Sequence, residues 1–119
     1  MDKKIIFWGV VAIIAIIITV GIVSYLGIKK DAELIYLYYS DFCPHCKTVE
    51  NYIVESDISS RLKIVSKEVS QSKENASELY LRAGECGYKV EEVGVPMLLA
   101  GGKCFMGDQP IIDYFESGK

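Results

Sequence analysis

An uninterrupted run of apolar residues near the start of the chain limits its fold more than any other feature. Residues 5–28 are 24 consecutive positions without a charged side chain. A membrane-spanning helix needs about 20 apolar residues, and a helix of this length would cover roughly 36 Å. Trp8 and Tyr25 lie near the two ends, where aromatic rings favour the membrane–water interface. We therefore predict a short N-terminal flank (1–4) and a transmembrane anchor (5–28).

Two other interpretations of this run are a buried core helix and a cleavable signal peptide. The rest of the chain is too small to wrap a core helix of this length. The apolar region of a signal peptide usually covers about 7–15 residues and ends at a small-x-small cleavage site. This run is longer and ends in Ile22-Val23-Ser24-Tyr25, which favours an uncleaved signal-anchor. Lysines flank both ends of the run and do not decide its orientation in the membrane. Our default expectation is a single-pass membrane protein with an extracytoplasmic domain.

The rest of the chain is predicted to be a charged linker (29–33) and one small domain (34–119). The whole chain has 13 basic and 16 acidic residues and a net charge of −3, which argues against nucleic-acid binding because that requires a basic face. Half of the residues are hydrophobic, which excludes a disordered chain. Four cysteines are too few for a disulfide-dense scaffold. Contact with membrane lipid is expected for residues 5–28.

The apolar pattern after the linker predicts an α/β domain with the element order β-α-β-α-β-β-α. The strands are expected over residues 34–39, about 62–69, 95–100 and 103–106. A first helix should begin at Pro44, since proline is favoured at the first helical position. A second should cover residues 76–83 and end at Gly84. A third should be capped by Asp108 and stop at Gly118, and Gly101-Gly102 should turn between the last two strands.

The motif Cys43-Pro44-His45-Cys46 carries the clearest chemistry. Two thiols three positions apart at a helix start lie one turn apart and can close a disulfide. As the N-cap, Cys43 would face the unpaired N–H groups and the positive end of the helix dipole, which stabilise a thiolate. A protonated His45 would favour that thiolate further, and Cys46 would be the resolving thiol. Stabilising the reduced form makes the disulfide a stronger oxidant.

The same spacing could supply half of a zinc site. A structural zinc site needs a second C-x-x-C or a pair of histidines. Cys86 and Cys104 are instead 18 positions apart, and His45 is the only histidine. We therefore expect no metal and no cofactor other than a redox-active disulfide. A strand before the motif and a helix after it are typical of a thioredoxin-like redox site.

Residues 39–46 read Tyr-Ser-Asp-Phe-Cys-Pro-His-Cys, and Gly94-Val95-Pro96 follows about 50 positions later. These two motifs resemble the thioredoxin superfamily. Pro44-His45 and Val95-Pro96 are similar to the DsbA-type disulfide oxidases, whereas the small size and Gly101-Gly102-Lys103 resemble glutaredoxin. The resemblance implies a minimal thioredoxin/glutaredoxin-like fold with a mixed four-stranded sheet. It also implies a cis Pro96 against the active-site disulfide and a substrate peptide received at Val95.

The resemblance also implies partners: cysteine-containing protein substrates, with glutathione and a membrane redox partner as further candidates. Thioredoxins and DsbA-type oxidases have a buried acid six residues before the first cysteine. That position here is Leu37, and glutaredoxins commonly lack the acid as well. A buried carboxylate would accept the proton of the resolving thiol, so water or the substrate would do so here.

Cys86 and Cys104 have three interpretations: a structural disulfide, a second redox pair, or two small buried hydrophobic side chains. In an oxidising compartment the structural disulfide is favoured. The sequence thus predicts a membrane-tethered thiol–disulfide oxidoreductase, with disulfide oxidase or isomerase activity favoured over reductase activity. The alternative is a non-enzymatic thioredoxin-like module that binds a metal between Cys43 and Cys46, or a partner in the groove at Pro96.

Overall fold

The computed structural model describes residues 2–26 and 33–118, which belong to two separate units. Of the predicted charged linker, only Glu33 lies within the described residues. The last two residues of the predicted anchor, 27 and 28, also lie outside them.

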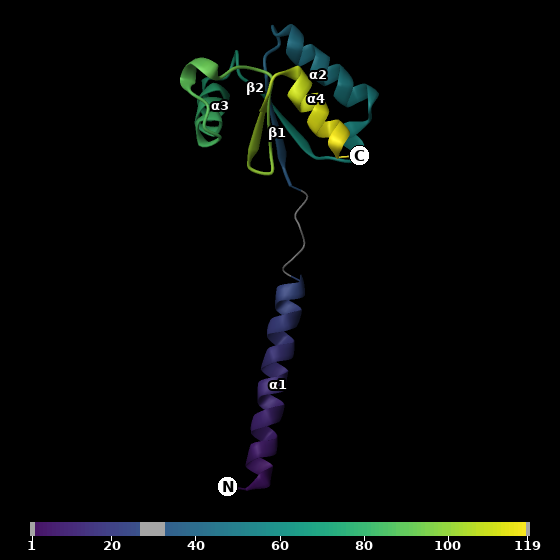
Figure 1. The fold of residues 1–119 in the computed structure, drawn as a ribbon, viewed down its shortest axis with the longest axis vertical. Helices are drawn as coiled ribbons and strands as arrows, with labels where there is room; N and C mark the ends of the chain where they lie inside the picture. The colour runs from purple at the N-terminus through teal and green to yellow at the C-terminus, as the bar shows by residue number, and fades with distance from the viewer. Residues whose placement is uncertain (1, 27–32, 119) are drawn as a thin grey trace. The chain divides into compact units, whose positions relative to one another are not determined.

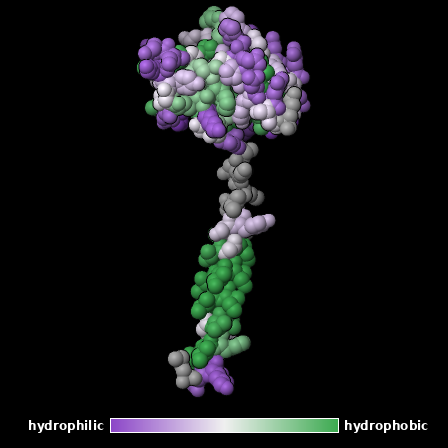
Figure 2. Space-filling view, in the orientation of Figure 1, coloured by the Kyte–Doolittle hydropathy of each residue, from purple (hydrophilic) through white to green (hydrophobic). Residues whose placement is uncertain are grey.

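The first unit is a single helix, α1 (Lys3–Leu26). It includes Lys3 and Lys4, because lysine is a good helix former and the carbonyl of Asp2 accepts a hydrogen bond from the N–H of Ile5 at 2.9 Å. Hydrophobic residues cover most of the face of α1 that Figure 2 shows, and none of the helix is buried within the structure. By length and composition, α1 is able to span a membrane.

The second unit contains one four-stranded sheet with the strand order β2-β1-β3-β4. Its strands are β1 (Ile35–Tyr39), β2 (Ile64–Glu68), β3 (Met97–Ala100) and β4 (Lys103–Met106). β2 runs parallel to β1, whereas β3 and β4 are antiparallel to their neighbours. The helices are α2 (Pro44–Glu55), α3 (Lys73–Glu85) and α4 (Asp108–Ser117), with short 3-10 turns at Ile58–Ser60 and Val90–Glu92. This order confirms the predicted β-α-β-α-β-β-α domain and its mixed sheet.

The sheet separates two apolar layers, because successive side chains of a strand point to opposite faces. Leu37 belongs to the layer that packs against α2 and α4, with Leu98 and Ile111. Tyr38 belongs to the layer on the α3 side, with Leu79 and Met97. Figure 1 shows α2 and α4 on one side of the sheet and α3 on the other.

The end of α3 was predicted wrongly, because Gly84 lies inside the helix. The helix continues to Glu85, with Cys86 as the C-cap and Gly87 at a φ of 91°. The N–H of Gly87 donates to the carbonyl of Gly84, and that of Tyr88 donates to the carbonyl of Ala83, each at 3.0 Å. This pair of bonds is a Schellman motif, which needs a left-handed residue after the cap, and Gly87 is the glycine in that place.

Other boundaries also differ from the prediction: α3 begins at Lys73, three residues earlier than expected, and β1 and β2 are slightly shorter. Asp108 is the first residue of α4 and Gly107 is the N-cap, which makes no side-chain capping bond. β3 begins at Met97, two residues later than expected. The predicted Gly101-Gly102 turn is present, with φ values of 60° and 71° that suit a two-residue hairpin.

Candidate active site

The local sequence places Cys43 at the start of α2, immediately beyond the end of β1. Its backbone is extended, with φ −102° and ψ 114°, and Pro44 is the first helical residue. The N–H of Cys46 donates to the sulfur of Cys43 at 3.2 Å. Cys43 thus occupies the N-cap with its sulfur turned toward the unpaired N–H groups of the first turn. This geometry stabilises negative charge on that sulfur.

The two cysteines of the motif differ in exposure. Both are free thiols; Cys43 is half-buried, and Cys46 is only 1% exposed. Burial, followed by the hydrogen bond to Cys43, raises the pKa of Cys46 to about 12. Cys46 therefore keeps its proton at neutral pH, while the sulfur of Cys43 is the one that solvent and a partner can reach.

Val95 and Pro96 lie against the motif although they are far from it in the chain. The thiol of Cys43 donates to the carbonyl oxygen of Val95 at 3.7 Å, across 52 positions. The Val95–Pro96 peptide bond is cis, and Pro96 is fully buried. The structure thus brings together the two motifs on which the resemblance was based.

The start of α4 closes the site on another side. The N–H of Gly107 donates to the carbonyl of Pro96 at 2.9 Å. Asp108 then lies beside His45, with 3.0 Å between Oδ2 and Nδ1. The hydrogen bond to His45 lowers the pKa of Asp108. Asp108 was predicted only as a helix cap, and nothing in the local sequence indicates that its carboxylate pairs with the histidine of the motif.

Leu37, six residues before Cys43, has apolar surroundings in the structure. Leu37 is 2% exposed and belongs to the core beneath α2. Within residues 2–26 and 33–118, none of the fully buried side chains is charged. A proton leaving Cys46 must therefore pass to a group other than a carboxylate at this position.

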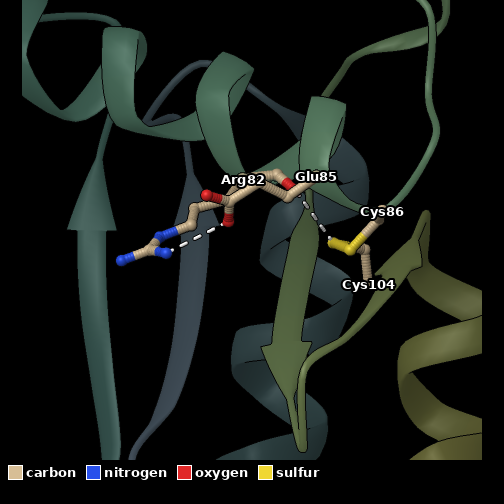
Figure 3. Close-up of a disulfide and its surroundings, with 4 residues drawn as sticks. All are labelled: Arg82, Glu85, Cys86 and Cys104. Atoms are coloured by element: carbon tan, nitrogen blue, oxygen red, sulfur yellow. Dashed lines mark hydrogen bonds and ion pairs between the residues drawn. A yellow bond between two sulfur atoms is a disulfide. The ribbon is translucent and has the colours of Figure 1, made fainter.

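Cys86 and Cys104 form a disulfide with each other (Figure 3), with their Cα atoms 6.0 Å apart. The bond joins the C-cap of α3 to β4. Arg82, which Figure 3 shows beside it, forms an ion pair with Glu85 at 3.1 Å. Because these two sulfurs are bonded to each other, they are not available as ligands for the zinc site that the sequence analysis considered. Over the described parts of the chain, no three His, Cys, Asp or Glu side chains cluster as metal ligands.

The element order and the mixed four-stranded sheet are those of a thioredoxin-like fold. No protein-family model matches the sequence, and no curated protein is similar to it. Solved structures are similar at the level of the fold. A protein of Agrobacterium tumefaciens matches 72% of this chain with a TM-score of 0.57 and 18% identity; the match spans 44% of the length of that protein. Oxidised glutaredoxin 2 of Chlamydomonas reinhardtii matches 72% of this chain and 74% of its own, with a TM-score of 0.50 and 17% identity.

Proposed function

We propose that this protein is a membrane-tethered thiol–disulfide oxidoreductase that exchanges disulfides with protein substrates through Cys43 and Cys46. The observation that carries the proposal is the asymmetry of the two thiols. The half-buried sulfur of Cys43 accepts an N–H bond at a helix start, whereas Cys46 is buried and its pKa is raised to about 12. A nucleophile that solvent can reach, beside a buried second thiol, is the arrangement that two-step exchange requires.

In the reducing direction, the thiolate of Cys43 attacks one sulfur of a substrate disulfide. The substrate S–S bond breaks, a mixed disulfide with Cys43 forms, and the other substrate sulfur leaves as a thiolate. Cys46 then loses its proton to water or to the leaving sulfur and attacks Cys43. The Cys43–Cys46 disulfide forms, and the first substrate sulfur is released as a thiolate. Oxidation of a substrate dithiol is the reverse sequence.

The position of the Val95 carbonyl supports the proposal that the substrate is a peptide or protein. It lies 3.7 Å from the sulfur of Cys43, and Val95 immediately precedes the buried Pro96 and β3. A substrate segment in extended conformation could donate a backbone N–H to this carbonyl once its own cysteine reaches Cys43. Pairing through the main chain would accept many sequences, which suits protein substrates in general.

We propose the oxidising or isomerising direction over the reducing one. Two observations support it: the Cys86–Cys104 disulfide is of the kind that persists in oxidising compartments, and α1 could tether an exported domain. A membrane redox partner would then return Cys43 and Cys46 to the disulfide, and glutathione is the candidate small-molecule partner.

The exchange activity is testable with the full chain in detergent. The reduced protein is mixed with a peptide that contains one disulfide, and release of the peptide thiols is followed over time. Wild type and the surface control Ser77→Ala should release thiols at equal rates, and Cys43→Ser should fall to the uncatalysed rate. A Cys43→Ser variant as fast as wild type would contradict the proposal. Wild type without any activity would favour the non-enzymatic binding module.

The side of the membrane needs a separate experiment in intact cells. The cells are first treated with a membrane-impermeant reductant, which opens the Cys43–Cys46 disulfide. Cys43 should then react with a membrane-impermeant maleimide before the cells are permeabilised, because we propose an extracytoplasmic domain. The Cys43→Ser variant identifies the labelled residue. Labelling of Cys43 only after permeabilisation would contradict the proposed orientation and leave the exchange chemistry unaffected.

A further inference from the structure

A second sulfur pair lies beside a cavity that none of the residues of the Cys43–Cys46 motif lines. The cavity has a volume of about 510 Å³, and Cys86 and Cys104 both form part of its wall. This volume lies within the range of small-molecule sites, about 300–1,000 Å³. The remaining wall includes the side chains of Tyr88, Glu92, Lys103 and Phe105.

The wall has one cationic side chain, Lys103, and one acidic side chain, Glu92. Lys103 begins β4, is exposed, and forms no ion pair with any residue that the structure describes. Glu92, the acidic residue of the wall, already accepts the backbone N–H of Lys89 at 2.8 Å through one carboxylate oxygen. The ammonium group of Lys103 is the one cation among the residues of this wall, and it is the group to which a carboxylate beside the disulfide could bind.

The two sulfurs have different surroundings. Cys104 packs against the apolar layer on the α3 side of the sheet, and its sulfur lies 3.5 Å from the carbonyl oxygen of Arg82, as Figure 3 shows. Cys86 follows the last turn of α3 and is half-buried at the cavity wall. We take Cys86 as the sulfur that is attacked. Once Cys104 has been released and protonated, its S–H could donate to the Arg82 carbonyl, a contact that stabilises the reduced product.

We propose that Cys86–Cys104 is a second thiol–disulfide exchange site, opened by a small thiol that carries a carboxylate and binds in this cavity next to Lys103. The thiolate of the small molecule attacks the sulfur of Cys86, the Cys86–Cys104 bond breaks, and Cys104 leaves as a thiolate that takes a proton from water. A second small thiolate attacks the mixed disulfide and releases Cys86. Two small thiols are oxidised to one small disulfide, and the protein disulfide is reduced to two thiols. The site does not depend on the chemistry proposed for Cys43.

The test uses the full chain in detergent with Cys43→Ser and Cys46→Ser, so that one disulfide remains. The probes are 3-mercaptopropionate, which carries a carboxylate, and 2-mercaptoethanol, which is neutral. Opening is measured by alkylation and intact mass, and each rate constant is divided by the thiolate fraction of the probe. The same measurement on the wild-type chain, with the peptides of Cys86 and Cys104 quantified separately, does not require the double variant to fold.

We expect both thiols to open the disulfide in the folded protein. Lys103→Gln should lower the rate constant for 3-mercaptopropionate about two- to five-fold, the effect of one exposed charge pair, and leave that for 2-mercaptoethanol unchanged. Lys73→Gln, which removes an exposed lysine remote from the cavity wall, should change neither rate. Opening only at denaturing urea concentrations would overturn the proposal. An unchanged 3-mercaptopropionate rate in Lys103→Gln, or an equal fall for both probes, would overturn it as well.

Discussion

The sulfur of Cys43 and the carbonyl oxygen of Val95 are 3.7 Å apart although 52 positions separate them in the chain. The topology explains the distance. β1 and β3 are antiparallel neighbours, with Tyr38 opposite Met97, so the end of β1 and the start of β3 lie at the same edge of the sheet. α2 begins just beyond this edge with Cys43 as its cap, and the residues that follow β4 reach the same place.

The raised pKa of Cys46 predicts a loss of stability at alkaline pH. The unfolded thiol has an ordinary pKa of 9.0, whereas that of the folded one is about 12. Below about pH 9 both forms hold the proton; as the pH rises above it, the unfolded chain loses its proton first, so the free energy of unfolding falls. The slope from this thiol approaches about 1.4 kcal/mol per pH unit.

Urea unfolding at several pH values between about 7 and 10.5 measures this slope, with near-ultraviolet circular dichroism of the tyrosines as the signal. Cys46→Ala should show a shallower fall above about pH 9. Burial also raises the pKa of Tyr38, so part of the alkaline fall should remain in the variant. Equal slopes in wild type and Cys46→Ala would show that burial does not hold the proton on Cys46.

The pair between His45 and Asp108 predicts a local effect with little change in stability. The two side chains are 71% and 34% exposed, and pairs of this kind contribute about 0–1 kcal/mol. Because the chain has one histidine, its ring protons give an isolated nuclear magnetic resonance signal. Asp108→Asn should shift that signal at constant pH, and Asp113→Asn, further along α4, should not. A His45 signal that is the same in wild type and Asp108→Asn would contradict the observed contact.

The Cys86–Cys104 disulfide predicts a large stability effect for the domain. The bond closes a loop of 18 positions, for which loss of the cross-link costs about 3 kcal/mol. The double variant Cys86→Ser/Cys104→Ser should therefore have a lower urea midpoint, with a larger m-value because its unfolded chain is less compact. A loss below about 1 kcal/mol would indicate that the unfolded chain gains little freedom when the bond is removed.

Much of the fold was predictable because its signals are local. The apolar runs of the strands, Pro44 at the first helical position and the Gly101-Gly102 turn each indicate a structure within a few residues of themselves, and the element order follows from them. The wrong prediction that α3 ends at Gly84 also came from a local signal. A glycine near the end of a helical pattern is a stop signal, but Gly87 lies three residues further on, and only the backbone geometry shows which of the two adopts a positive φ.

The site itself was predictable only in part. Cys43 and Cys46 share a motif, so their spacing indicates their chemistry. The contact of His45 with Asp108 joins positions 63 apart. It forms because the chain leaves β4 close to the start of α2 and begins α4 there. No property of either residue in the sequence indicates that contact. The pairing of Cys86 with Cys104 likewise required the tertiary arrangement, since the sequence left three interpretations open.

The measurement that tests the central proposal most directly is trapping of the mixed disulfide in cells. In Cys46→Ala the second thiol is missing, so substrates attached to Cys43 cannot be released by the intramolecular attack. We predict that Cys46→Ala accumulates high-mass species that disappear on reduction, whereas Cys43→Ala/Cys46→Ala, with Cys86 and Cys104 intact, accumulates none. Absence of these species in Cys46→Ala, or their persistence in the double variant, would contradict the assignment of Cys43 as the attacking thiol.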